Sequence, residues 1–141
     1  MGFVDLKGSD KQVDWAKNIR EDVWNIVNIA IEEDPKWYME REKWTEKRQK
    51  INEKSYKEVK GFLLDLDKNE KASDWINTFG WCCPNKKKRD ADRSAYLIEM
   101  LNPVTNELKN HCRSVFTQSI PNLCEPILKK RTEICVEYTG E

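Results

Sequence analysis

A long stripe of apolar residues, spaced three or four positions apart near the start of the chain, constrains the fold most. The stripe consists of Val13, Ala16, Ile19, Val23, Ile26, Val27 and Ala30. This spacing places the side chains on one face of an α-helix, where they can be buried together. Ser9 and Gln12 precede the stripe with the spacing of a capping box. We therefore expect a helix that starts after Ser9 and ends at the Glu-Glu-Asp-Pro segment 32–35.

A second helix is expected to begin at Pro35, because proline is tolerated at a first helical position and Asp34 can cap it. Large apolar residues then recur at intervals of seven, and these are Trp37, Trp44 and Ile51. This repeat predicts a long helix with one narrow buried seam and an otherwise charged surface. The pattern leaves open a break of this helix near 52–55.

A short amphipathic helix is expected over 72–79, with Gly80 as its C-terminal stop, and a loop over 81–89. Asp90 can cap the next helix, which Asn102-Pro103 should end before a further helix begins. The last segment is ambiguous, because a helix fits its first half but the β-formers of 132–139 also suit a short strand.

The composition fits one folded domain. The chain has 141 residues, 38% of them hydrophobic, with six Trp, four Tyr and four Phe, which argues against disorder. We expect an all-α compact single domain over 1–141 with five or six helices, in which 81–141 pack on an N-terminal three-helix module at 3–80. The net charge of zero disfavours a general polyanion binder, so nucleic acid could be bound only by a local patch.

Two short segments carry a resemblance. Positions 7–20 read Lys-Gly-Ser-Asp-Lys-Gln-Val-Asp-Trp-Ala-Lys-Asn-Ile-Arg, and positions 72–77 read Ala-Ser-Asp-Trp-Ile-Asn. They resemble a helical module, here spanning 3–80, of short uncharacterised proteins from Gram-positive bacteria, their phages and mobile elements. The resemblance implies a mobile-element origin and no particular reaction. Residues 81–141 resemble no module known to us.

The tryptophans indicate a candidate protein-binding surface. Trp44 stands among charged neighbours, and an aromatic ring rimmed by charge is typical of an interaction hot spot. The candidate partner-binding residues are Trp44, Arg41, Lys47, Arg48 and Trp81. The alternative, which the pattern favours slightly, is that Trp44 fills the internal seam of the long helix.

A second candidate surface is the most concentrated positive charge in the chain. Its residues are Lys86, Lys87, Lys88, Arg89 and Arg93, with Trp81 nearby. Cations beside an aromatic ring suit phosphate contact and base stacking. The simpler interpretation is a solvated loop that keeps the chain in solution.

The five cysteines give little support for chemistry. Cys82-Cys83 and His111-Cys112 lack the ligand spacing of zinc sites, and His111 is the only histidine. A Cys–His nucleophile pair would have to bring Cys82, Cys83, Cys124 or Cys135 to His111, and no motif points to that. We expect no metal, no cofactor and no catalytic residue.

The expected function is therefore a non-enzymatic protein-binding accessory factor of a phage or mobile element. A specific form is an inhibitor of a host defence system, of the anti-CRISPR type, whose partner is a host or defence-system protein. The alternatives are a nucleic-acid-binding accessory protein that uses 86–89, and a small cysteine-dependent enzyme or metal protein. The start of the chain has no apolar signal region and no apolar run reaches membrane-spanning length, so we expect the cytoplasm of the host cell and no membrane partner. The sequence contains no indication of oligomeric state.

The cysteines provide a first prediction. In a reducing compartment all five should be free thiols, so thiol titration of the unfolded protein should find five and elemental analysis should find no stoichiometric metal. About one zinc per chain would contradict this.

Overall fold

A computed structural model describes residues 5–68, 70–83, 86–91 and 93–112 of the chain. These residues form five helices, which are α1 (Asp10–Glu40), α2 (Glu46–Lys68), α3 (Ala72–Phe79), α4 (Lys86–Ala91) and α5 (Arg93–His111). Within these ranges the only β-type pairing is an isolated bridge between Lys7 and Lys71. The all-α prediction is confirmed for this part of the chain. The expectations for 113–141, including the short strand, lie outside the described residues.

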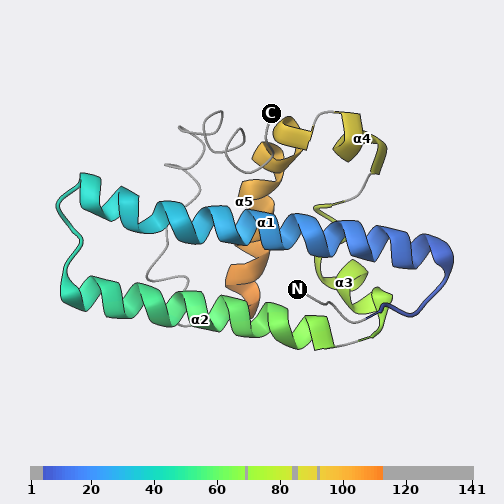
Figure 1. The fold of residues 1–141 in the computed structure, drawn as a ribbon, viewed down its shortest axis with the longest axis horizontal. Helices are drawn as coiled ribbons and strands as arrows, with labels where there is room; N and C mark the ends of the chain where they lie inside the picture. The colour runs from blue at the N-terminus through green and yellow to red at the C-terminus, as the bar shows by residue number, and fades with distance from the viewer. Residues whose placement is uncertain (1–4, 69, 84–85, 92, 113–141) are drawn as a thin grey trace.

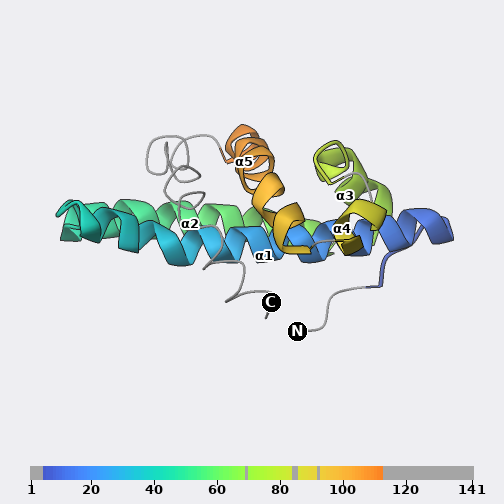
Figure 2. The ribbon, with the colours of Figure 1, turned by 90° about the horizontal axis from the view of Figure 1, so that it is seen from above.

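The helices form two layers. α1 and α2 run antiparallel as a long hairpin, and α5 crosses α1 at a steep angle (Figure 1). Seen from above, α3 and most of α5 lie on one side of this hairpin, whereas α4 lies level with α1 (Figure 2). α1 packs against α2, α3 and α5, so the other helices are assembled around it.

The start of α1 is fixed as the sequence predicts. The Ser9 side chain accepts a hydrogen bond from the Gln12 backbone N–H at 3.2 Å, and the Gln12 side chain accepts one from the Ser9 N–H at 3.1 Å. Gly8 has a φ of +156°, and a Cβ there would lie 2.9 Å from the Gln12 side-chain oxygen. The glycine therefore lets the chain turn into the capping box, while the Ala72 N–H donates to the Lys7 carbonyl at 3.0 Å and ties this turn to α3.

The core is built on the apolar stripe of α1. Six of its seven predicted members are buried and Val13 is half-buried. Trp75 and Phe79 of α3 are fully buried against it, with their ring centroids 6.1 Å apart. The remaining large core side chains come from α2 and α5, and they include Val59, Leu63, Leu97, Leu101 and Leu108.

The predicted end of the first helix is wrong. α1 continues through Pro35 to Glu40, so Asp34 caps no second helix and Trp37 belongs to α1. Packing explains the continuation, because Asp34 and Tyr38 are both buried and the last turns of α1 present them to the interior. The chain reverses over 41–45 instead, where Glu42 adopts a φ of +54°.

Consequently Trp44 lies in the connection between α1 and α2, and the seam of Trp37, Trp44 and Ile51 on a single helix does not exist. The break that the sequence left open at 52–55 is absent as well. Asn52 and Ser55 are buried within α2, and the Ser55 hydroxyl donates to the Ile51 carbonyl at 3.2 Å.

The later boundaries are partly confirmed. The helix over 72–79 is confirmed, with Gly80 as its C-cap. The expected loop over 81–89 is wrong at its end, because 86–91 form α4 and Asp90 lies inside that helix. α5 also runs through Pro103, where a boundary was expected. The fully buried Leu101, Val104 and Leu108 lie on both sides of this proline, so apolar burial maintains the helix across it.

The position of Pro35 inside α1 leads to a prediction. Proline in a helix interior removes one hydrogen bond and crowds the preceding turn, so Pro35→Ala should stabilise the fold by about 1–3 kcal/mol in denaturant unfolding. Asn28→Ala, at an exposed position of the same helix, is the control and should gain about 0.7 kcal/mol or less. A Pro35→Ala variant no more stable than the control would mean that the helix ends before Pro35.

Candidate functional site

Four of the predicted partner-binding residues gather at one end of the molecule, and these are Arg41, Trp44, Lys47 and Arg48. We call this region, residues 38–51, the hairpin end, because α1 turns there into α2 (Figure 1). The half-buried Trp44 ring packs against the Tyr38 ring in a tilted arrangement, with the centroids 6.2 Å apart and the planes inclined by 37°. The Arg48 guanidinium carbon lies 5.2 Å from the centroid of the Tyr38 ring, within the range of a cation–π contact.

The backbone of the hairpin end is held by hydrogen bonds. The N–H groups of Arg41 and Lys43 donate to the Tyr38 carbonyl at 3.2 and 2.9 Å. Thr45 caps α2, since its hydroxyl accepts from the Arg48 N–H at 3.1 Å and its carbonyl from the Gln49 N–H at 2.8 Å. These bonds pre-organise the turn that presents Trp44.

A hollow of about 440 Å³ opens at the hairpin end. Its lining combines apolar surface with three cations and one carboxylate, from Tyr38, Glu42, Lys43, Thr45, Lys47, Arg48 and Ile51. This volume lies within the range of about 300–1,000 Å³ that is usual for ligand pockets. Tyr38 was not among the predicted partner-binding residues, because the sequence pattern placed Trp37, Trp44 and Ile51 on one helical seam.

A buried polar cluster lies beneath the hairpin end. Asp34 accepts hydrogen bonds from the Asn52 side-chain amide, at 2.7 Å, and from the Tyr56 hydroxyl. Burial raises the pKa of the Asp34 carboxyl to about 6, while these two hydrogen bonds and the nearby charge of Arg48 act in the opposite direction. The cluster joins α1 to α2, and Asn52 follows Ile51 of the hollow's lining in the sequence.

Trp81, the remaining predicted partner-binding residue, is not part of the hairpin end. It follows α3, which lies toward the opposite end of the molecule (Figure 1). The residue is 61% exposed, and its indole N–H donates to a Glu107 carboxylate oxygen at 3.1 Å. The other oxygen of Glu107 lies 3.2 Å from the His111 ring, which stacks on Phe62 with centroids 4.7 Å apart.

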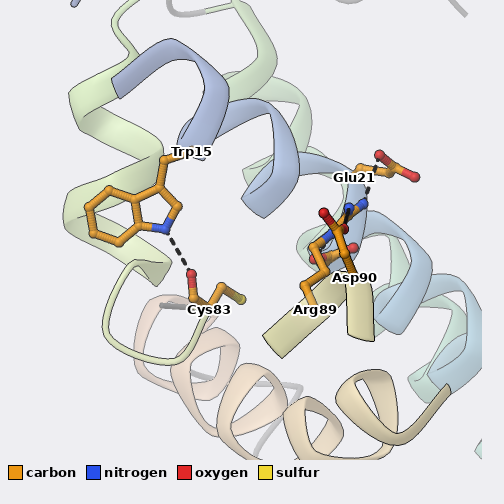
Figure 3. A network of polar contacts seen from close by, with 6 residues as sticks. Trp15, Glu21, Cys83, Arg89 and Asp90 are labelled. Atoms are coloured by element: carbon orange, nitrogen blue, oxygen red, sulfur yellow. Dashed lines mark hydrogen bonds and ion pairs between the residues drawn. The ribbon is translucent and has the colours of Figure 1, made fainter. Parts of the chain in front are cut away.

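The basic segment lies in an acidic environment. Arg89, only 11% exposed in its side chain, contacts Asp22 at 2.8 Å and Glu21 and Asp90 at 3.1 Å each (Figure 3). Burial opposes its charge, but these carboxylates raise the pKa of its guanidinium. Lys87 is exposed, whereas the side chains of Lys86, Lys88 and Arg93 lie outside the described part of the structure. Arg89 is thus engaged in joining α4 to α1.

The described cysteines are part of the interior. Cys82, Cys83 and Cys112 are buried free thiols, and the Cys83 carbonyl accepts a hydrogen bond from the Trp15 indole at 2.8 Å (Figure 3). Burial raises the pKa of Cys112 to about 11, which keeps the thiol protonated at neutral pH. The described residues contain no group of three or more side chains suited to hold a metal ion. Cys124 and Cys135 lie outside the described residues.

The comparisons with known proteins leave the hairpin end as the main guide to function. No protein-family model, no curated protein and no solved structure matches the chain. Among the described helices, none is long and apolar enough to cross a membrane.

The buried carboxyl of Asp34 leads to a prediction about pH. The pKa is about 6 in the folded protein against 3.8 for an ordinary aspartate, so folding favours the protonated form. The stabilising effect of this proton is present below about pH 4 and is lost as the pH rises through about 6. Asp34→Asn, which mimics the protonated group, should raise the melting temperature more at pH 7.5 than at pH 5. The corresponding gain in the free energy of unfolding at pH 7.5 should be at most about 3 kcal/mol.

Asp65→Asn, at an exposed position of α2, is the matched control for the loss of one carboxyl charge without the loss of a buried group. An equal change of melting temperature by Asp34→Asn at pH 5 and at pH 7.5 would contradict the prediction that a buried carboxyl titrates between these two pH values.

Proposed function

We propose that the chain is a non-enzymatic protein-binding accessory factor whose contact surface is the hairpin end. The single observation that carries the proposal is the position of Trp44, half-buried on a structured turn and leaning on Tyr38. Arg41 and Lys47, both exposed, lie near this ring in the sequence and carry positive charge. Tryptophan, tyrosine and arginine are the residues most enriched at the energetic centres of protein interfaces.

The geometry also favours a low cost of binding. Ordering a flexible loop or a long side chain opposes association, whereas a turn that is already hydrogen-bonded loses little freedom. The Trp44 ring is partly positioned by Tyr38, and the backbone before and after it is held by the hydrogen bonds to Tyr38 and Thr45. A partner could therefore bury the exposed part of the indole without reorganising α1 or α2.

The partner we propose is a host or defence-system protein. The resemblance of residues 3–80 to modules of phages and mobile elements supports this choice, since such accessory proteins act on the cell they enter. In its most specific form the proposal is an inhibitor of the anti-CRISPR type that acts in the host cytoplasm. The basic segment gives weaker support to nucleic-acid binding, because Arg89, one of its cations, is engaged by carboxylates.

Substitution of Trp44 provides the test. Trp44→Ala removes a ring that is only half-buried, so it should cost about 2 kcal/mol of stability or less, below the 3–5 kcal/mol typical of a core tryptophan. The same change should weaken partner binding by 2 kcal/mol or more, on the order of thirtyfold. Thermal melts give the first quantity. Affinity capture from a host lysate, with mass spectrometry and a nucleic-acid stain of the eluate, tests the weaker partner binding. It should appear as the loss of a specific protein from the eluate.

Trp81→Ala is the matched variant, because it removes the same ring from the other candidate surface. We expect it to retain the protein that Trp44→Ala loses. Loss of capture with Trp81→Ala alone would move the binding surface to the end near α3. RNA or DNA in the eluate without a specific protein would contradict the proposal.

A further inference from the structure

We infer that the hollow at the hairpin end binds an acidic segment of a protein partner, seating a carboxylate against its cations and a neighbouring apolar side chain against Tyr38 and Ile51. The inference rests on the proposed function, because it names what the partner presents to this surface.

The charges around the hollow favour an anion. Its lining holds three cations, Lys43, Lys47 and Arg48, against the single carboxylate of Glu42. Within the described residues, neither Lys43 nor Lys47 has an ion-pair partner. The lining also includes the first turn of α2, where the helix dipole adds partial positive charge. Both lysines are exposed, so binding an anion would require little change of the fold.

Arg48 gives the site its directional element. It is half-buried, and its guanidinium lies over the Tyr38 ring with 5.2 Å between the guanidinium carbon and the ring centroid. A guanidinium held on an aromatic face keeps its hydrogen-bonding edge available and pre-oriented for a carboxylate. The exposed lysines would then strengthen binding as point charges around this fixed group.

The chemistry of the lining favours an acidic protein segment over a nucleic-acid backbone. Tyr38 and Ile51 contribute apolar surface, which an aliphatic side chain next to a carboxylate would cover. Glu42 in the lining lowers its net positive charge, which disfavours a ligand held by charge alone, such as a strand that carries a phosphate at every nucleotide. The net charge of zero also provides no long-range attraction for a polyanion.

The test titrates the full chain, labelled with ¹⁵N, with three probes and follows the backbone amide resonances. The first probe is a capped hexapeptide of sequence Glu-Glu-Leu-Glu-Glu-Leu, the second is its Gln-Gln-Leu-Gln-Gln-Leu counterpart, and the third is a thymidine hexanucleotide. The acidic peptide should shift resonances of residues 42–51 saturably, and should bind at least tenfold more tightly than the other two probes. The affinity should fall as salt is raised, because exposed charges are screened.

The variant pair separates the site from general charge. Lys43→Gln with Lys47→Gln should weaken the acidic peptide at least tenfold, whereas Lys54→Gln with Lys57→Gln should have little effect. The two pairs remove the same charge, and all four lysines are exposed, so both proteins should fold normally. Equal binding of the Gln peptide, tighter binding of the hexanucleotide, or equal weakening by both lysine pairs would each overturn the inference.

The failure of this inference can be told apart from the failure of the proposed function. If Trp44→Ala loses the natural partner but the Lys43→Gln, Lys47→Gln variant retains it, the hairpin end binds protein. The inference that the partner presents an acidic segment is then wrong. If Trp44→Ala retains the partner, the proposed surface itself is wrong, and the inference falls with it.

Discussion

The structure depends on the burial of one face of α1. This helix contacts α2, α3 and α5, and its stripe of Ala, Val and Ile side chains supplies the surface on which each of them packs. Because the stripe lies along much of a 31-residue helix, elements that are far apart in sequence share one core. Trp75 and Phe79 of α3 fill that core at one end, while α5 crosses it near the middle (Figures 1 and 2).

Beyond that core, α1 and α2 continue toward the hairpin end, where polar contacts replace apolar packing. Asp34, Asn52 and Tyr56 join the two helices by hydrogen bonds, and Tyr38 supports both Trp44 and Arg48. A buried carboxyl costs free energy unless it is protonated or well bonded. The same cluster, however, joins α1 to α2 one turn before Tyr38, so the two helices that flank the candidate site are held together by these hydrogen bonds.

The sequence predicts the elements whose signal is local and misses those decided by packing. The Ser9–Gln12 capping box and the helix before Gly80 are correct, because the residues that stabilise them are neighbours in the chain. The sequence predicts helix boundaries at Pro35 and Pro103, yet residues on both sides of each proline are buried and the helix continues across it. For the site, Trp44, Arg41, Lys47 and Arg48 do gather at one place, but the sequence assigned them to a helix face. Tyr38 could have been identified as a site residue only from its contact with the Trp44 ring. That contact exists only because the chain turns between the two residues.

Three locally unfavourable features lie close together near the hairpin end: a proline inside a helix, a buried carboxyl and a non-glycine residue with positive φ. They are Pro35, Asp34 and Glu42. Each is disfavoured on its own, so a surface selected only for stability would tend to lose them. Pro103 and the buried carboxyls of Asp22 and Asp67 show that single features of these kinds also occur elsewhere in the fold. Their combination next to a hollow with a cationic lining supports the proposed binding surface, since local rules are most often broken at functional sites.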